Sequence, residues 1–259
     1  MTEDEWHEKI LRAASLRPAP VEMVTYRGKD WPNNFAKPVV LADREGLDYV
    51  VKCPKLGKIF ARATTTEQIV SSLAFSVGMP VAEVRLAELS QDLLDLQIET
   101  AHMSPGIAHA SMMITNCSEA AWLAHTDVPE NRPRFALLAL LYGWAAAAYD
   151  EQFIYSLSKP PLVYSVDHGA FFVGGPLWTG ENLDSANREA VCLDRIVTEC
   201  QLSEEELRTA TEIVSTISDD AFARAVAQPP DEWEVSITER VSVAKFLSER
   251  RDHLVSQYQ

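Results

Sequence analysis

The chain has 259 residues, 47% of them hydrophobic and 24% charged, and its 38 acidic and 23 basic side chains give a net charge of −15. This length and composition are typical of a globular protein with a substantial core, arranged either as one large domain or as two lobes that share a cleft. The strong negative charge repels a phosphate backbone, so we expect no nucleic acid partner.

The first twelve residues are acidic, whereas a signal peptide or a mitochondrial presequence is basic there, and no run approaches the roughly 18 apolar residues of a membrane span. We therefore expect a cytoplasmic protein with no membrane partner. The cysteines lack the close spacing of zinc ligands and are interpreted as reduced thiols: Cys53, Cys117, Cys192 and Cys200.

The first hundred residues predict a leading helix and then an antiparallel sheet interrupted by one helix. The leading helix spans 2–16 and is stopped by the Arg-Pro-Ala-Pro run that follows, and the second helix spans 64–78. The expected strands are 37–42, 48–53, 80–86 and 93–99.

The remainder of the chain predicts mainly helices. Residues 134–148 are rich in Ala and Leu and apolar nearly all round, which indicates a buried helix. Ser203 with Glu206 and Ser236 with Glu239 form capping boxes, which open helices that run to about residue 217 and to the C-terminus.

Lys52 lies in the β-branched run Asp-Tyr-Val-Val-Lys-Cys, where an unpaired ammonium would be costly to bury. In protein kinases such a lysine binds ATP phosphates and pairs with a glutamate on the next helix, which here would be Glu67 at the start of that helix. The alternative is that Lys52 faces water from an edge strand and that Glu67 is an ordinary first-turn acid favoured by the helix dipole.

Two aspartates flank a short predicted hairpin in the second half of the chain. Asp150 follows the buried helix, and Asp167 follows the strand-like run 162–166 and begins Asp-His-Gly. Phosphoryl transfer requires one carboxylate that accepts the proton of the acceptor hydroxyl and another that holds Mg²⁺ against the phosphates. Taken alone, an Asp-His-Gly triplet could equally be an ordinary turn.

Several segments, in this order, give the chain a more specific identity. The chain resembles the HipA-like kinase family, a distant relative of protein and phosphatidylinositol kinases, from about residue 24 to the C-terminal helix. The resemblance is carried by YVVK (49–52), EQIVSSLAFSVGMPV (67–81), LYGW (141–144), YDEQFIY (149–155), VYSVDHGAFF (163–172) and GGPLWT (174–179).

The family's fold implies a mixed α+β, bilobal, protein-kinase-like structure. A small antiparallel-sheet lobe with one helix and the leading helix would take 1–103, and a larger helical lobe would take 104–259.

The resemblance implies a role for each candidate residue. Lys52 is similar to the phosphate-binding lysine, Glu67 to its helix partner, Asp150 to the catalytic aspartate and Asp167 to the metal-binding aspartate. The loop 28–37 would cover the phosphates, and because Gly28 is its only glycine, Asn33 and Asn34 would have to supply the turn conformations. The implied cofactors are ATP and Mg²⁺.

The chain departs from the family in the catalytic loop. Family members usually carry an Asn-x-Asp-Arg run with a metal-binding Asn about five residues after the aspartate, whereas here Glu151 follows Asp150 and the fifth position is Tyr155. Gln152 offers a carbonyl oxygen as a substitute metal ligand. Ala170 stands where a bulkier side chain is expected after Asp-His-Gly.

These residues lead to two functional hypotheses, beside the alternative that the resemblance misleads and the chain is a structural or nucleotide-independent binding protein. The first is an ATP-dependent kinase whose acceptor is a Ser or Thr hydroxyl of a protein or peptide, or a hydroxyl of a small molecule. The second is a pseudokinase, a nucleotide-sensing or partner-binding module, with Glu151 and Tyr155 as its signature.

The histidines are interpreted as sites of no chemistry. His102 and His109 are expected on the surface, and His168 is expected to be isolated. A catalytic triad of Ser165, His168 and Asp167 is excluded because neighbours on one strand point to opposite faces of the sheet.

Overall fold

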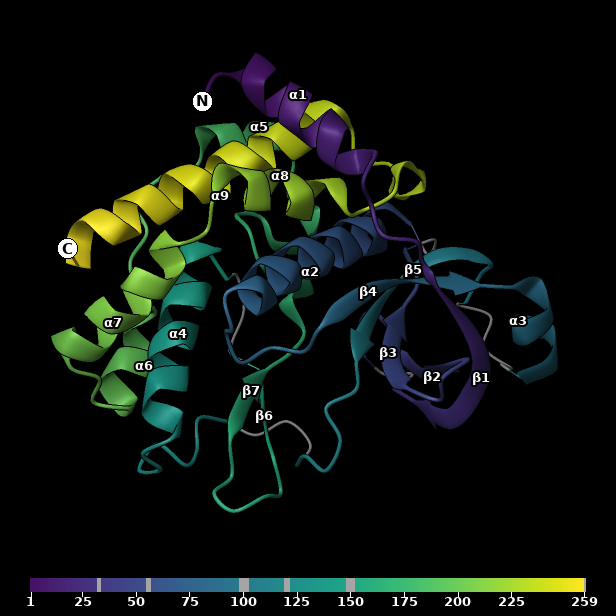
Figure 1. The fold of residues 1–259 in the computed structure, drawn as a ribbon, viewed down its shortest axis with the longest axis horizontal. Coiled ribbons are helices and arrows are strands. Elements are labelled where there is room, and N and C mark those ends of the chain that lie inside the picture. Colours follow the sequence, from purple (N-terminus) through teal and green to yellow (C-terminus); the bar gives the residue numbers. More distant parts are fainter. Residues whose placement is uncertain (32–33, 55–56, 98–102, 119–121, 148–151, 259) are drawn as a thin grey trace.

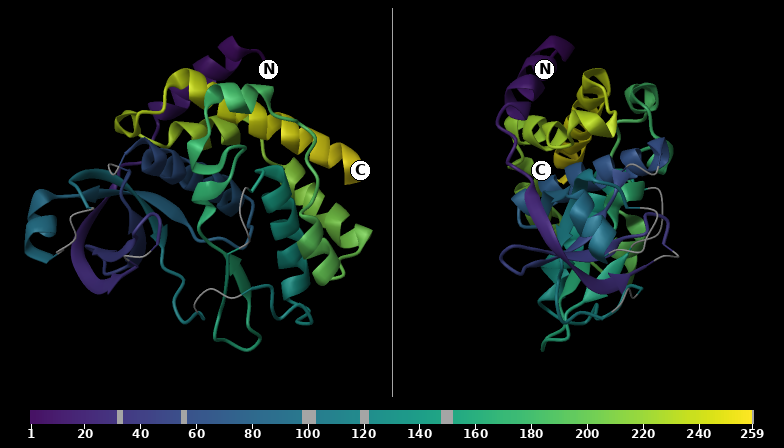
Figure 2. Two further views of the ribbon diagram at one scale, coloured as in Figure 1. Left: turned by 180° about the vertical axis from the view of Figure 1, so that it is seen from behind. Right: turned by 90° about the vertical axis from the view of Figure 1, so that its right-hand side faces the viewer.

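A small closed sheet and a group of helices lie side by side, with a long helix, α2 (Lys58–Ser76), between them (Figure 1). The computed structural model describes residues 1–31, 34–54, 57–97, 103–118, 122–147 and 152–258. The view from behind shows the same division (Figure 2). The mixed α+β class expected from the sequence is thus the class of the structure.

The closed sheet is a barrel in which nearly all neighbouring strands are antiparallel. Its strands, in spatial order, are β1 (Val21–Asp30), β2 (Val39–Asp43), β3 (Asp48–Lys52), β5 (Gly106–Met112) and β4 (Val84–Leu89). The exception is the closing pair, because β1 runs parallel to β4, with Val21 opposite Ala87. The expected all-antiparallel sheet is therefore wrong at this closure.

Several expected elements differ from those observed. The predicted strand 93–99 is wrong, because the chain forms helix α3 (Gln91–Gln97) there, with the Ser90 hydroxyl accepting a hydrogen bond from the Leu93 N–H at 3.2 Å. Leu93 and Leu94 face the barrel core together, which a helix achieves with adjacent leucines and a strand does not. Strands β1 and β5 were not predicted.

The hairpin between β2 and β3 forms as its turn residues predict. Gly46 adopts a φ of 82°, and Asp43 Oδ1 accepts hydrogen bonds from the N–H groups of Glu45 and Leu47, both at 2.9 Å. Tyr49 of β3 also donates to Asp43 Oδ2 at 3.3 Å. This hydrogen-bonded turn fixes the register of β3 against β2, and it thereby fixes the position of Lys52 at the end of β3.

The remaining helices pack together and against one side of α2. They are α1 (Glu3–Ala14), α4 (Asn131–Trp144), α5 (Gly180–Ser185), α6 (Asp194–Glu199), α7 (Glu204–Ser215), α8 (Asp219–Ala227) and α9 (Ile237–Tyr258). The capping box of Ser203 and Glu206 is present at the start of α7, and Ser236 and Glu239 exchange the corresponding hydrogen bonds at the start of α9. Within the described residues, none of the helices is both long and apolar enough to cross a membrane.

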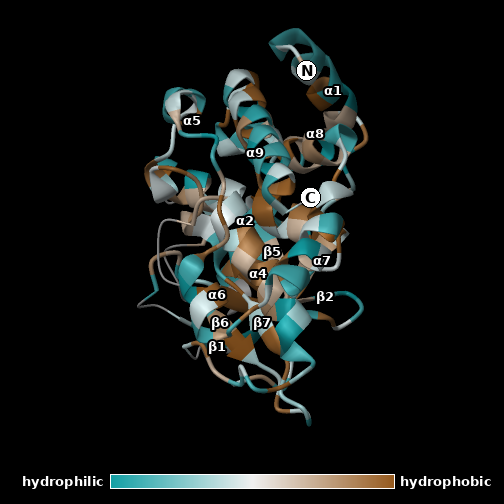
Figure 3. Ribbon diagram, turned by 90° about the vertical axis from the view of Figure 1, so that its left-hand side faces the viewer, coloured by the Kyte–Doolittle hydropathy of each residue, from teal (hydrophilic) through white to brown (hydrophobic). Residues whose placement is uncertain are grey.

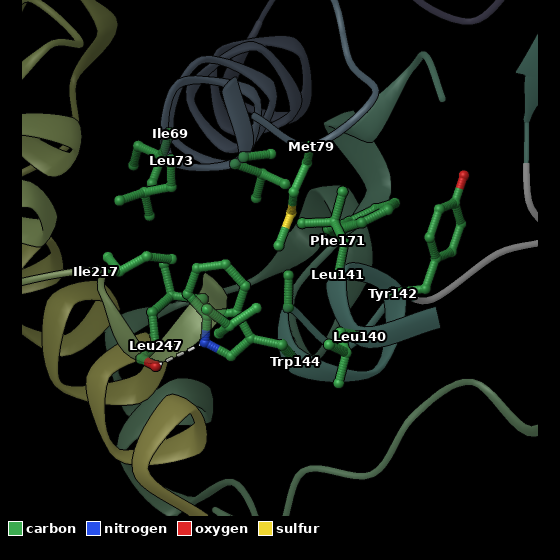
Figure 4. Packing of buried hydrophobic residues seen from close by; sticks show 14 of the residues in the cluster. Ile69, Leu73, Met79, Leu140, Leu141, Tyr142, Trp144, Phe171, Ile217 and Leu247 are labelled. Carbon is green, nitrogen blue, oxygen red and sulfur yellow. Dashed lines mark hydrogen bonds between the residues drawn. The ribbon is translucent and has the colours of Figure 1, made fainter. Parts of the chain in front are cut away.

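The larger hydrophobic core lies among α2, α4 and α9. Figure 4 shows Ile69 and Leu73 of α2 above Trp144 of α4, whose indole N–H donates to the Leu247 carbonyl at 2.8 Å. The hydropathy colouring shows apolar residues gathered around α4, while the outer helices carry hydrophilic ones (Figure 3). This packing fixes α2 against the helical side of the molecule.

Two short strands and two 3₁₀ turns complete the region beneath α2. Strands β6 (Phe153–Tyr155) and β7 (Val163–Ser165) form an antiparallel hairpin. Directly after β7 comes a 3₁₀ turn, η2 (His168–Ala170), and then a second one, η3 (Gly175–Leu177). Both turns pack against α2, and this brings residues far apart in the sequence to one place.

Candidate active site

Lys52 is the last residue of β3, and only 6% of its surface is exposed. Its Nζ donates hydrogen bonds to Glu67 Oε2 at 2.6 Å and to Asp167 Oδ1 at 2.7 Å. Because β3 pairs with β2 on one side and β5 on the other, it is an internal strand. The alternative interpretation, an edge-strand lysine facing water, is therefore wrong.

Burial alone would lower the pKa of Lys52, but the nearby carboxylates of Asp167 and Glu67 together outweigh it and raise the pKa. The lysine is therefore firmly cationic.

Glu67 lies in the middle of α2 and is 4% exposed. The helix begins at Lys58, well before the predicted start at Thr64, so the interpretation of Glu67 as a first-turn acid is wrong. Burial raises the pKa of Glu67, although the ion pair with Lys52 opposes this.

Asp167 lies between β7 and η2 in a left-handed conformation, with φ 61° and ψ 58°. Its side chain is 40% exposed, whereas that of Glu67 is 6% exposed. The charge of Lys52 lowers the pKa of Asp167 against the opposing effect of burial, and a side-chain hydrogen bond from Gln152 lowers it further. Asp167 is thus an ionised carboxylate that remains open on one side.

A cavity of about 280 Å³ adjoins these groups, close to the lower limit of roughly 300 Å³ for ligand pockets. Its walls come from the loop before β2, the end of β3, α2, the residue before β6 and the segment after β7. They consist of Phe35, Ala36, Lys52, Ala63, Thr64, Glu67, Gln152, Asp167, Gly169, Ala170, Phe171 and Pro176.

The small side chain of Ala170 belongs to this wall. The ring of Phe35, another wall residue, stacks on Phe60 of α2, with centroids 4.7 Å apart.

Of the other predicted site residues, the structure describes Asn34 but not Asp150. Asn34 takes part in a turn, in which its N–H donates to the Trp31 carbonyl at 3.1 Å and its carbonyl accepts from the Lys37 N–H at 3.0 Å, while the adjacent Phe35 lines the cavity. Asp150 and Glu151 lie outside the described residues, as do Asn33 and His102.

Tyr155 is buried away from the cavity. Its hydroxyl donates to the Trp122 carbonyl at 3.2 Å and accepts from the Ala124 N–H at 2.8 Å. The position where the family usually carries an Asn is therefore held by a side chain with a structural role.

The oxygen atoms at the cavity fit a hard divalent cation in part. The Asp167 carboxylate faces the cavity, and the Gln152 amide can present its carbonyl oxygen once it turns from its hydrogen bond to Asp167. Among the residues that the structure describes, no group of three or more His, Cys, Asp or Glu side chains is arranged to hold a metal ion. Of the two carboxylates that pair with Lys52, Asp167 is the more accessible, because its side chain is 40% exposed and that of Glu67 is 6% exposed.

His109 is completely buried, so its predicted surface position is wrong. It lies on β5 directly opposite Lys52 of β3. Its Nδ1 is 2.7 Å from Gln68 Oε1, and its Nε2 is 3.7 Å from Glu67 Oε1. Burial lowers the pKa of His109 to about 3, so the ring is neutral at ordinary pH.

His168 is also buried, and the prediction that it is isolated is wrong. Its Nδ1 is 2.8 Å from Ser71 Oγ, and its Nε2 is 2.9 Å from Ser165 Oγ. The serine and histidine meet because His168 lies in the 3₁₀ turn rather than on the strand. They form no catalytic triad, since Ser165 is fully buried and Asp167 bonds Lys52 instead.

Sequence reasoning missed Gln68 and Ser71 as parts of this region. Both are buried polar residues on α2, and Gln68 Nε2 donates to Gln228 Oε1 at 2.6 Å. The available signal was their position on either side of the apolar pair Ile69 and Val70, because a polar residue on a buried helix face requires a partner.

Comparison with known proteins supports a kinase relationship. The model of the HipA-like kinase family matches residues 32–139, which confirms the resemblance over this part of the chain. No curated protein matches the sequence.

Among solved structures, the proinflammatory kinase CtkA of Helicobacter pylori is similar at 12% identity and a TM-score of 0.59, over 92% of this chain and 96% of that one. At this identity the likeness concerns the fold. The Golgi casein kinase with Mn/ADP bound gives a TM-score of 0.49 at 11% identity, over 98% of this chain and 76% of that one.

Proposed function

We propose that this protein is a HipA-like, ATP-dependent kinase that transfers the γ-phosphoryl group to a hydroxyl, either a Ser or Thr of a protein or peptide or a small-molecule hydroxyl. The observation that carries the proposal is the buried Lys52, which bridges Glu67 and Asp167 at the wall of a cavity. A lysine held by one enclosed and one accessible carboxylate suits phosphate binding beside a metal.

The proposed bilobal arrangement follows from the barrel and the helices. The small lobe comprises the barrel and α2, and the larger lobe comprises the helices from α4 onward. In this proposal we place the boundary between the lobes at about residue 112 rather than at residue 103, so that β5 stays with its partners β3 and β4. The leading helix α1 packs on α8 and α9, so it joins the larger lobe.

The proposed roles divide according to exposure. Lys52 contacts the phosphates, and Glu67 orients it from α2. Asp167 and the turned carbonyl of Gln152 hold Mg²⁺, which when bound neutralises phosphate charge. Lys52 with two carboxylates leaves a net charge of −1 in the ligand-free site, a charge that favours entry of a cation.

Asp150 is proposed to accept the proton of the acceptor hydroxyl as the phosphoryl group is transferred. The test is phosphoryl transfer from γ-labelled ATP to mixtures of peptides and small hydroxyl compounds. Asp150→Ala should reduce transfer about 100-fold or more while nucleotide binding persists. Ser242→Ala, a buried change in α9 at a residue that does not line the cavity, should leave transfer unchanged.

The second candidate function is a pseudokinase that binds nucleotide without transfer. It is favoured by Tyr155, whose hydroxyl is bonded within the structure where the family usually places a metal-binding Asn. The two functions separate cleanly: binding of Mg²⁺ and nucleotide with no transfer to any acceptor supports the pseudokinase, and absence of nucleotide binding rejects both.

A further inference from the structure

A chain of buried hydrogen-bonding side chains adjoins the residues that line the cavity, since it includes His168, which lies between cavity-lining Asp167 and Gly169. Ser71 Oγ lies 2.8 Å from His168 Nδ1, His168 Nε2 lies 2.9 Å from Ser165 Oγ, and Ser165 Oγ lies 2.8 Å from the Tyr142 hydroxyl. The Tyr142 hydroxyl also accepts the backbone N–H of Gln152 at 3.1 Å. We call Ser71, His168, Ser165 and Tyr142 the hydroxyl–imidazole chain.

The hydroxyl–imidazole chain joins separate parts of the fold. Ser71 is on α2 one turn after Glu67, Ser165 ends β7, and Tyr142 is on α4. In Figure 4 the Tyr142 hydroxyl points away from the apolar cluster. Every member is at most 3% exposed, so water cannot supply hydrogen bonds to these groups. Each hydroxyl and ring nitrogen therefore depends on its neighbour for a hydrogen bond.

In the sequence, Asp167 lies between Ser165 and His168, two members of the hydroxyl–imidazole chain. Its left-handed backbone costs about 1 kcal/mol for a residue other than glycine, so its surroundings must hold it in place. Ser165 is fixed before it, with its backbone N–H donating to the Pro80 carbonyl at 2.8 Å, and His168 is fixed directly after it. The segment therefore has an anchor on each side of Asp167.

The imidazole suits this anchor because it bonds through both nitrogens while remaining neutral. Each flanking hydroxyl can donate or accept, so either tautomer of His168 satisfies the chain. The His168 ring also packs edge-on against Phe171, with centroids 5.1 Å apart. Close approach of the turn to α2 is possible because Gly169 has no Cβ, which would lie 3.1 Å from the Ala63 carbonyl oxygen.

We propose that His168 is a positioning residue that keeps Asp167 in register with Lys52 by joining α2 to β7. This role rests on the proposed function, in which Asp167 is the metal ligand. Loss of the anchor lets the Asp167 turn move relative to α2, and this weakens metal-dependent nucleotide binding more than it weakens the rest of the fold.

The test compares Ser71→Ala and His168→Phe with Ser242→Ala. Phe keeps an aromatic ring beside Phe171 but removes both hydrogen bonds. Ser242 is the matched control, because it is 3% exposed like Ser71, its hydroxyl donates to Asp184 Oδ2 at 2.9 Å, and it neither lines the cavity nor belongs to the hydroxyl–imidazole chain.

Two measurements are made on each full-length variant. The first is the Mg²⁺ concentration at half-maximal binding of fluorescent mant-ADP, and the second is amide hydrogen exchange over residues 165–171 without ligand. We expect Ser71→Ala to raise the Mg²⁺ midpoint and the exchange rates at least about fivefold, the equivalent of one lost hydrogen bond, with a larger effect in His168→Phe. Ser242→Ala should leave both quantities at the wild-type values.

Equal effects in Ser71→Ala and Ser242→Ala would overturn the positioning role, because a general loss of stability would then account for both. If the wild type binds no mant-ADP at any Mg²⁺ concentration, the proposed function fails, and the hydrogen exchange alone decides whether His168 anchors the turn. Unchanged exchange over residues 165–171 in His168→Phe overturns the anchor in either case.

Discussion

The buried ion pair of Lys52 and Glu67 makes a specific prediction about stability. Replacing Lys52 with Met keeps a long apolar stem but leaves the Glu67 carboxylate, 6% exposed, without its cation. Removing one partner of a buried pair typically costs about 3–5 kcal/mol. Asp167 is partly exposed, so the loss of Lys52 destabilises its carboxylate less than that of Glu67. We therefore expect Lys52→Met to lower the free energy of unfolding by about 3 kcal/mol at pH 8.

The informative quantity is the response to a second change. Glu67→Gln in the Lys52→Met background removes the unpaired charge, so the double variant should be more stable than Lys52→Met alone, with a coupling energy of about 2 kcal/mol. Free energies of unfolding from urea titrations at pH 8 complete the double-mutant cycle. The exposed pair of Arg44 and Glu22 is the control, and its coupling should vanish at high salt.

The pH dependence provides an internal check. Burial raises the folded-state pKa of Glu67 above its ordinary value of 4.5, so a protonated Glu67 stabilises Lys52→Met as the pH falls towards 4.5. Between the folded and unfolded pKa values, each pH unit returns about 1.4 kcal/mol. Additive energies in the cycle, or a Lys52→Met variant equally destabilised at pH 5 and pH 8, would refute the buried pair.

Three further changes test separate features by denaturant unfolding. Burial lowers the pKa of His109 from 6.5 to about 3, so the free energy of unfolding falls by about 1.4 kcal/mol per pH unit as the pH drops below 6.5. His109→Gln should flatten this dependence of the unfolding free energy on pH between about pH 6.5 and 4.5. An unchanged slope would contradict the buried neutral ring. In Gly143→Ala the added Cβ would overlap the Val191 carbonyl oxygen, so we expect the free energy of unfolding to fall by about 3 kcal/mol or more. A denaturation midpoint equal to that of the wild type would contradict this packing. Gly169→Ala meets the Ala63 carbonyl oxygen at 3.1 Å and should cost only about 1 kcal/mol while weakening mant-ADP binding in Mg²⁺; an unaltered affinity would show that the turn tolerates displacement from α2.

The partnership of Lys52 and Glu67 could be predicted because each residue stands out locally. A lysine in a β-branched strand requires an anion, and a glutamate on the next helix supplies one. Asp167 could be predicted for a similar reason, since it ends a strand and precedes a turn. These local rules do not depend on the order of strands in the sheet.

The position of His109 could not be predicted in this way. Its strand reads Gly-Ile-Ala-His-Ala-Ser-Met, which has little β-branched character, and its burial depends on the pairing of β5 with both β3 and β4. His168 escaped prediction because a 3₁₀ turn after β7 rotates its side chain towards Ser165. The first miss arises from strand pairing that a local window does not contain, and the second from a local turn that the strand pattern did not indicate.

Helix α3 shows the opposite failure, where a local pattern was misleading. Alternating apolar residues suggested a strand, but the Ser90 cap and the adjacent Leu93 and Leu94 favour a short helix on the barrel. The start of α2 was misplaced because Thr64, Thr65 and Thr66 resemble a polar boundary. They are buried instead, so the helix continues through them from Lys58.

The central claim, that Lys52 and Asp167 form a metal-dependent nucleotide site, is tested most directly by calorimetric titration of ADP with and without Mg²⁺. The wild type should bind one nucleotide and require Mg²⁺ for full affinity. Lys52→Met and Asp167→Asn, studied where circular dichroism shows them folded, should each weaken binding at least about tenfold, in keeping with the loss of a charged contact. Absence of binding by the wild type, or equal affinity in all three proteins, would contradict the claim.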